Sequence, residues 1–163
     1  MSYTVNSSNG EYLVGVISDT HGLVRPEAVA ALQGVSLIIH AGDVGTPEVL
    51  EQLGIVAPVV AVRGNTDQEW WARELPLTEV VEIGMVSFCV LHNVHELDLD
   101  PVASGFGAVI SGHSHQPLID RRNGVLFLNP GSAGAMRLKL HPTVAVLTVK
   151  EKSINAKIIG LGV

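Results

Sequence analysis

Short apolar runs alternate with polar loops along the first half of the chain. Runs rich in Val, Ile and Leu occupy residues 12–18, 37–40 and 59–62, and a polar loop follows each of them. The intervening segments 26–33 and 47–53 each begin with a proline, which favours the first turn of a helix. Strands that alternate with helices in this way predict parallel strands and an α/β fold.

The second half of the chain has a different pattern, in which apolar runs come in pairs around short turns. The paired runs are 79–83 with 86–91, 119–121 with 125–129, and 143–149 with 153–159, and a single short run covers 108–111. Asn123-Gly124 in the second turn is a strong signal for a β-hairpin. Parallel units followed by antiparallel hairpins supply enough strands for two packed sheets.

Length and composition narrow the class of protein. A chain of 163 residues fits one domain, which we place at 11–163 after a flexible polar leader at 1–10. The net charge of −6 argues against a nucleic-acid groove, and no apolar run is long enough to span a membrane. The single Cys89 excludes an internal disulfide and, with no signal peptide, predicts a cytoplasmic protein.

The surface composition also bears on assembly. Only 16% of the residues are charged, and Trp70 and Trp71 stand together directly after a polar loop. Aromatic and apolar residues are enriched in the cores of protein interfaces, so a homodimer is expected. Packing within the chain and a lip over a binding site are the alternative roles for the two tryptophans.

Polar side chains follow five of the predicted strands. They are Asp19 with His21, Asp43, Asn65 with Asp67, His92, and His113 with His115. Sites in α/β sheets form outside the carboxyl ends of the strands, so we expect the strand ends of one sheet to bring these residues together. Glycines beside most of them permit tight turns and close approach of the backbone.

These residue types predict a metal centre with two ions. Seven side chains are candidate ligands: Asp19, His21, Asp43, Asn65, His92, His113 and His115. His and Asp are common ligands of divalent transition metals, and one tetrahedral ion takes only about four ligands. The two divalent ions carry the positive charge of such a centre, and two carboxylates and a bridging hydroxide carry its negative charge. The net charge is about +1. Such a pocket suits the single negative charge of a phosphodiester.

Six short motifs follow one another along the chain: SDTHG at 18–22, HAGD at 40–43, RGNTD at 63–67, LH at 91–92, SGHSH at 111–115 and NPGS at 129–132. Together they resemble the calcineurin-like metallophosphoesterases, and in particular the small bacterial and archaeal phosphodiesterase branch. The resemblance covers residues 12 to about 160. It implies a four-layer αββα sandwich, in which helices flank two mixed β-sheets.

The resemblance also implies a role for each motif. Asp43 would bridge two ions, the first held with Asp19, His21 and His115, and the second with Asn65, His92 and His113. The ions would be Mn, Fe, Co, Ni or Zn. The phosphate would contact Asn65, Thr66 and His92, and the candidate catalytic residues are Asn65 and Asp67. The loop 129–132 would brace the site.

The implied activity is hydrolysis of small phosphodiesters by a hydroxide that bridges the two ions. Two positions depart from the family pattern. Thr66 stands where larger members carry a His that assists the leaving group, and Asn93-Val94 follows His92 where many relatives have Gly-His. A missing general acid removes about 10²–10⁴-fold of catalysis, so modest rates and a bias toward good leaving groups are expected.

Other interpretations are open from the sequence. There are two alternatives to a phosphodiesterase. One is a phosphomonoesterase, and the other is a non-catalytic scaffold like the retromer subunit that shares this fold. Asp67 is compatible both with orienting a metal ligand and with capping a helix. His40 is expected to support the site rather than to bind metal, while His95 and His141 are expected at the surface.

Overall fold

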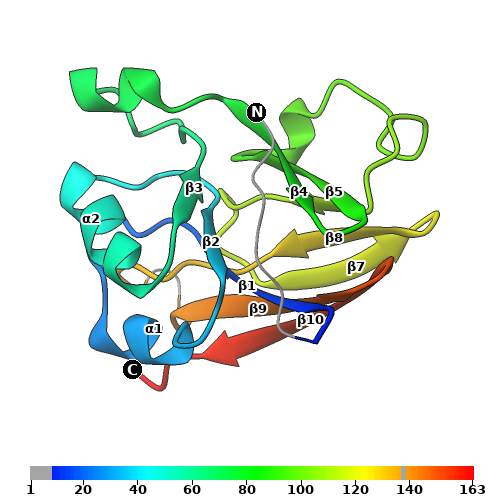
Figure 1. Cartoon of the computed structure of the whole chain (residues 1–163). Helices are drawn as coiled ribbons and strands as arrows, with labels where there is room; N and C mark the ends of the chain where they lie inside the picture. The colour runs from blue at the N-terminus through cyan, green and yellow to red at the C-terminus, as the bar shows by residue number, and fades with distance from the viewer. Residues whose placement is uncertain (1–8, 137–138) are drawn as a thin grey trace.

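Two five-stranded β-sheets form the body of the molecule (Figure 1). The structure is a computed structural model, and it describes residues 9–136 and 139–163. Most of the expected leader at 1–10 therefore lies outside the described residues, and Asn9 and Gly10 form a turn before the first strand.

Sheet A carries the parallel units of the first half and the last hairpin of the chain. It consists of β1 (Glu11–Ile17), β2 (Leu37–His40), β3 (Val59–Ala61), β9 (Thr143–Lys150) and β10 (Ser153–Gly160). The strand order is β10-β9-β1-β2-β3, with β1, β2 and β3 parallel and the β9–β10 hairpin antiparallel to β1. All four residues of β2 are buried, as expected for a parallel strand covered on both faces.

Sheet B contains the other two predicted hairpins. It consists of β4 (Thr78–Ile83), β5 (Val86–Leu91), β6 (Ala108–Ile110), β7 (Leu118–Arg122) and β8 (Val125–Asn129). The strand order is β4-β5-β6-β8-β7, in which β5, β6 and β8 are parallel and the edge strands β4 and β7 are antiparallel to their neighbours. Both sheets are therefore mixed, as predicted.

Two α-helices cover the outer face of sheet A and lie on the same side of the molecule in Figure 1. Helix α1 spans Pro26–Ala31 and helix α2 spans Pro47–Val56, and each starts with its proline. Helix α1 is shorter than predicted and α2 is longer. Val49 and Leu53 of α2 pack with Ile38 of the sheet, so burial of one apolar stripe holds this helix in place.

The main hydrophobic core lies between the two sheets. Phe88 of β5 and Leu128 of β8 meet Leu147 of β9 there, and these three side chains are fully or almost fully buried. Burial of an aromatic or leucine side chain contributes about 1.5–3 kcal/mol, so this interface is a large source of stability.

The outer face of sheet B is covered without an α-helix. The single 3₁₀ turn η2 (Val94–Glu96) and the turn-rich segment 97–107 lie over it, and Leu97 and Phe106 pack against its apolar side chains. Pro101 and the glycines of this segment disfavour a longer helix. The predicted sandwich is confirmed, and its fourth layer is reduced to this turn and loop.

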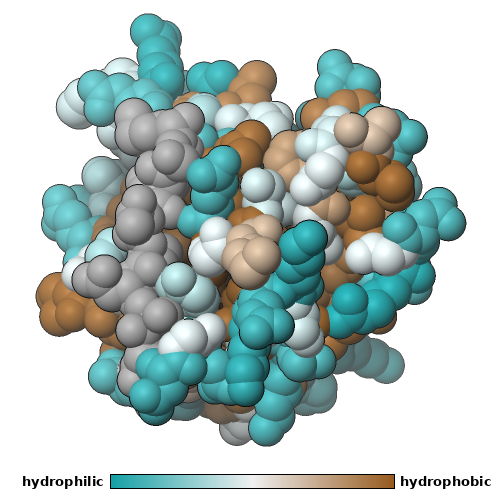
Figure 2. Space-filling model, turned by 45° about the vertical axis from the view of Figure 1, so that its right-hand side comes forward, coloured by the Kyte–Doolittle hydropathy of each residue, from teal (hydrophilic) through white to brown (hydrophobic). Residues whose placement is uncertain are grey.

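The surface carries scattered hydrophobic side chains. Figure 2 shows a group of them toward the upper right of one face, bordered by hydrophilic residues. In the short 3₁₀ helix η1 (Trp70–Glu74), Trp70 is 79% exposed whereas Trp71 packs against the helix-covered core. Within the described residues, no helix has the length and apolarity needed to cross a membrane.

Candidate metal centre

The polar residues predicted at strand ends lie together at one edge of the sandwich. Sheet A supplies Asp19, His21, Asp43, Asn65 and Asp67 after β1, β2 and β3, and sheet B supplies His92, His113 and His115 after β5 and β6. The expectation that the strand ends of one sheet supply them all was wrong. Contacts of Asp19 with His92 and His115 show that both sheets bring their strand ends to a common edge.

Two groups of three potential metal ligands share Asp19. One group is Asp19, His21 and His115, and the other is Asp19, Asp43 and His92; within each group the ligand atoms lie within 4.8 Å of one another. Asp19 Oδ1 lies 3.3 Å from His115 Nε2 and 3.8 Å from His92 Nε2. Asp43 Oδ2 lies 3.3 Å from His92 Nε2 and 3.8 Å from His21 Nε2. Both carboxylates therefore face both groups.

Five of the seven candidate ligands have a left-handed backbone. Their φ angles lie between 47° and 71°, and they are Asp19, His21, Asp43, His113 and His115. Such a conformation costs a residue other than glycine about 1–2 kcal/mol and persists only where the surrounding structure enforces it. This concentration of strain indicates that the loops are held for the orientation of these side chains.

Close approach between the loops depends on glycines. A Cβ atom on Gly64 would overlap the carboxylate and backbone of Asp43, and one on Gly112 would overlap Ser18 and approach Asp19. The predicted reason for glycine beside the ligands thus applies at these two positions: the neighbouring loop occupies the space that a side chain would need.

The two carboxylates lie at the base of the centre. Asp19 is completely buried and Asp43 is 3% exposed. Burial raises the pKa of Asp43, but the adjacent His92 imidazole and the hydrogen bond from the amide of Thr66 lower it more, so its net pKa lies below the ordinary range. Asp43 is therefore an anion in the folded protein across the physiological pH range.

His92 is oriented with its Nε2 toward the two carboxylates. Its Nδ1 lies 2.7 Å from the carbonyl oxygen of Ala41, which can only accept, so Nδ1 carries the proton and Nε2 faces the centre. Burial lowers the pKa of His92, whereas the Asp43 carboxylate and the Ala41 carbonyl raise it more, for a net upward shift. A metal ion at Nε2 would therefore compete with a proton drawn there by the same negative charge.

The donor set fits a bound divalent cation. Three buried atoms that face the centre have no hydrogen-bond partner: Asp19 Oδ1, His21 Nε2 and His92 Nε2. Among the described residues, no Lys or Arg lies within 4.0 Å of Asp19 or Asp43. Buried carboxylates are costly unless they are paired or coordinate a metal, and the two residue groups supply the Asp and His ligands that transition metals take.

The remaining candidates lie at the exposed mouth of the centre. Nδ1 of His113 lies 3.1 Å from Oδ1 of Asn65, and the His113 ring is 5.2 Å from the ring of His92. The Thr66 amide donates a 3.0 Å hydrogen bond to Asp43 Oδ1, so the loop of β3 is anchored on the carboxylate of β2. His113 is not part of either compact group, although it adjoins both Asn65 and His92.

Asp67 connects the loops around the centre. It is 4% exposed, and its carboxylate accepts hydrogen bonds from the amides of Gly64 at 2.9 Å, Gly45 at 3.0 Å and Val44 at 3.1 Å. These bonds tie the loop that carries Asp43 to the loop that carries Asn65. Of the two interpretations of Asp67, the contacts correspond to orienting a ligand loop.

His40 supports the centre from the end of β2, as expected from the sequence. The Gly42 amide donates to Nδ1, and Nε2 lies 2.9 Å from the hydroxyl of Thr20, which itself donates to the Val44 carbonyl. Nε2 must therefore donate, so the ring is neutral. Burial is the main cause that lowers the pKa of His40 to about 3, and the nearby His92 contributes to the same shift.

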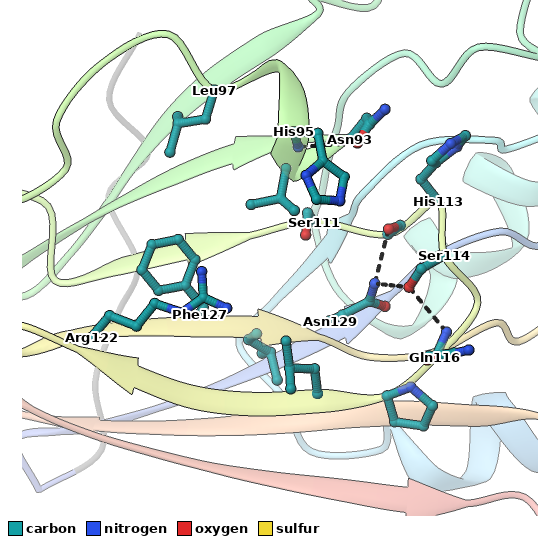
Figure 3. Close-up of a pocket in the computed structure, with 15 residues that line it drawn as sticks. Asn93, His95, Leu97, Ser111, His113, Ser114, Gln116, Arg122, Phe127 and Asn129 are labelled. Atoms are coloured by element: carbon teal, nitrogen blue, oxygen red, sulfur yellow. Dashed lines mark hydrogen bonds between the residues drawn. The ribbon is translucent and has the colours of Figure 1, made fainter.

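Side chains outside the ligand set also hold the centre, and of these Ser18 was not predicted from the sequence. Ser18 Oγ donates a 2.6 Å hydrogen bond to Asp19 Oδ2, and Ser132 Oγ donates to the Asp19 carbonyl. Asn129 donates to the Gly112 carbonyl and to Ser114 Oγ, as the dashed lines of Figure 3 show. These bonds agree with the bracing role expected for 129–132. A Ser directly before the first ligand was the available signal for Ser18.

Comparison with known proteins agrees with this geometry. Residues 12–152 match the family model described as the calcineurin-like phosphoesterase superfamily domain. A probable metallophosphoesterase of Methanothermobacter thermautotrophicus is 38% identical over 162 residues, which cover 92% of this chain and 93% of that protein.

Solved structures with the same fold include two kinds of protein. An archaeal phosphodiesterase superposes with a TM-score of 0.75 at 25% identity, over 90% of this chain and 99% of that one. Vps29 of Chaetomium thermophilum has a TM-score of 0.75 at 21% identity, over 91% and 96% of the two chains, and shows the fold alone. The family match and the metallophosphoesterase relative, with the ligand groups described above, establish that the chain belongs to the calcineurin-like phosphoesterase superfamily.

Proposed function

We propose that this chain is a metal-dependent phosphodiesterase that hydrolyses small phosphodiesters at the edge where the two sheets meet. The observation that carries the proposal is the buried pair Asp19 and Asp43, which faces histidine nitrogens and has no Lys or Arg partner among the described residues. The similarity to an archaeal phosphodiesterase supports the same reaction class.

The ligand residues would hold two divalent ions, drawn from Mn, Fe, Co, Ni and Zn. Asp19 lies at both positions, with His21 and His115 around one and Asp43 and His92 around the other, and Asn65 and His113 lie at the mouth of the second. When bound, the ions supply Lewis-acid polarisation of the phosphate and activation of water.

Residues at the mouth would orient the substrate. Oδ1 of Asn65 faces His113, which leaves the amide Nδ2 of Asn65 to donate a hydrogen bond to a phosphoryl oxygen. Thr66 is exposed beside it and offers a hydroxyl group. Asp67 acts through its three amide hydrogen bonds, which fix where Asn65 lies relative to Asp43, and we assign it a positioning role.

A diester is favoured over a monoester because of residue 66. Thr66 occupies the position where larger family members carry a His that helps the leaving group, and an alkyl monoester needs that help more than an activated diester does. A non-catalytic scaffold is the competing function, since Vps29 has the same fold. The complete set of candidate ligands favours the enzyme.

Metal analysis combined with activity assays tests the proposal. Purified protein loaded with each metal should contain about two ions per chain and should hydrolyse bis(4-nitrophenyl) phosphate faster than 4-nitrophenyl phosphate, with loss of activity on chelation. Asp43→Asn should lower metal content and the rates of both substrates alike. Asp100→Asn, at an exposed turn, is the matched control. Absence of bound metal under metal-replete conditions would refute the proposed function.

A further inference from the structure

A second structural feature adjoins the metal centre on the side of sheet B. It is a cavity of about 520 Å³, which we call the Phe127 cavity, with Asn93 and His113 in its wall next to the metal centre. His113 lies at one end of it and Phe127 with Arg122 at the other (Figure 3). The volume falls in the range of about 300–1,000 Å³ that is usual for small-molecule sites.

The wall of the Phe127 cavity combines an apolar part with a polar part. The apolar part is formed by Val94 and Leu97 from the segment after β5, Leu118 from β7, and Phe127 from β8. A polar margin is formed by side chains such as His95 and Gln116. The apolar part, at Val94, Leu97, Leu118 and Phe127, is the part of the cavity suited to an uncharged organic group.

Arg122 does not make this cavity an anion site. Its Nε is 2.8 Å from Asp120 Oδ2, and its guanidinium lies over the ring of Phe127, with 4.6 Å from Cζ to the ring centroid. It is also the only Lys, Arg, Asp or Glu among the described residues that line the cavity. The charge of Arg122 is thus neutralised by Asp120. The guanidinium of Arg122 and the ring of Phe127, stacked on each other, form this end of the cavity, and both groups are flat and weakly hydrated.

The other cavity beside the centre has the opposite character. It measures about 500 Å³, shares Asn93 and His113 with the Phe127 cavity, and is lined by Arg63, Glu96 and Asp98. A phosphodiester has two ester arms that diverge from one phosphorus atom. Among the described residues, Arg122, paired with Asp120, is the one such charged residue in the Phe127 cavity, whereas the other cavity has three, so an apolar arm has one favourable place to lie.

We propose that the Phe127 cavity binds an apolar ester arm of about the size of a phenyl group, and so selects phosphodiesters that carry one bulky apolar alcohol. The proposal rests on the proposed function, because the phosphate has to be held at the metal centre for its arm to reach this cavity.

Binding of two phosphonates to the metal-loaded protein tests this selectivity without turnover. Methylphosphonate and 2-phenylethylphosphonate share one headgroup and differ in the arm, so the ratio of their dissociation constants by calorimetry measures the arm alone. Burying a phenyl group should make the second compound about 10- to 100-fold tighter.

Two neighbouring residues of β7 provide a matched pair of variants. Leu118 is 45% exposed and lines the Phe127 cavity, whereas Ile119 is 43% exposed and does not line it. Leu118→Trp fills the cavity and should remove most of the advantage of the phenylethyl arm, while methylphosphonate binding is kept. Ile119→Trp adds the same side chain on the same exposed strand and should leave both affinities as they are.

The outcomes separate this proposal from the proposed function. Equal affinities of the two phosphonates in the unmodified protein, or an advantage that survives Leu118→Trp, would overturn the Phe127 cavity as a substrate site and leave metal-dependent diester hydrolysis standing. Failure of both phosphonates to bind the metal-loaded protein would remove the proposed function, and this proposal with it.

Discussion

Replacement of Asp67 by Asn separates a positioning role from a catalytic one. Asp67 accepts amide hydrogen bonds at 2.9, 3.0 and 3.1 Å from Gly64, Gly45 and Val44. An asparagine keeps one acceptor oxygen, which can retain the two bonds now made by Oδ2 in a weaker, uncharged form. Its NH₂ group would then face the Gly45 amide, donor against donor.

The size of the effect follows from these contacts. A hydrogen bond to a charged group contributes about 1.5–3 kcal/mol, so losing one and weakening two should cost about 3 kcal/mol of unfolding free energy. For a chain of this length, that corresponds to a fall in Tm of about 6–12 °C. The loops that carry Asp43 and Asn65 lose their common anchor, so the affinity for metal should fall as well.

Thermal unfolding of Asp67→Asn in the presence of a chelator measures the change in Tm when no metal is bound. Metal titration of the same variant then measures the effect on the centre. Asp100→Asn is the matched control, since Asp100 Oδ1 also accepts amide hydrogen bonds, from Val102 and Ala103, but in an exposed turn. There the change should cost less than about 1 kcal/mol, because water replaces the lost partner.

One result would refute this reasoning about Asp67. If Asp67→Asn unfolds within about 1 °C of the unmodified protein and binds metal normally, yet has lost activity, then Asp67 acts in the chemical step. The earlier assignment of Asp67 as a catalytic residue would in that case be the better one.

Three further predictions concern the leaving group, pH and assembly. Thr66→His should accelerate the hydrolysis of diesters with poor leaving groups by up to about 10²-fold, and that of nitrophenyl diesters much less. Equal effects on the two substrate types in steady-state kinetics would show that residue 66 does not contact the leaving group. The pKa of His40 is lowered from 6.5 to about 3, so the unfolded chain takes up the proton first and stability should fall by about 1.4 kcal/mol per pH unit from about pH 6.5 downward. In His40→Gln the free energy of unfolding should fall less steeply as the pH is lowered. Parallel curves of unfolding free energy against pH for the two proteins would contradict the lowered pKa of His40. The exposed Trp70 is expected in a homodimer interface, so Trp70→Ser should raise the monomer fraction in light scattering, whereas a monomer at micromolar concentration before mutation would exclude the dimer.

The local elements of this protein are readable from its sequence because their signals are local. A fully apolar run such as 37–40 fits a strand covered on both faces, and Asn123-Gly124 fits only a tight turn between paired strands. The metal ligands are readable for a related reason. His92 follows β5 directly, Asp19 and Asp43 lie in the loops just after β1 and β2, and the carboxyl ends of parallel strands are where side chains can converge.

Which sheet each strand joins was decided only by the tertiary structure. The pairs 79–83/86–91 and 143–149/153–159 look alike in sequence, yet the first belongs to sheet B and the second to sheet A. A hydrophobic pattern shows that one face of a strand is buried, but not which partner buries it. For the same reason the sequence did not indicate that His92 reaches Asp43 from the opposite sheet.

The contacts that support the metal centre and the Phe127 cavity were also decided only by the tertiary structure. The carboxylate of Asp67 receives amides from three residues in two loops, and the cavity wall comes from β7, β8 and the segment after β5. Neither arrangement leaves a periodic or compositional trace, because each depends on the distance between segments far apart along the chain. The sequence by itself determined the elements and the ligand types. Only the packing of the two sheets decided which ligands face one another, what holds them, and where an apolar substrate arm can lie.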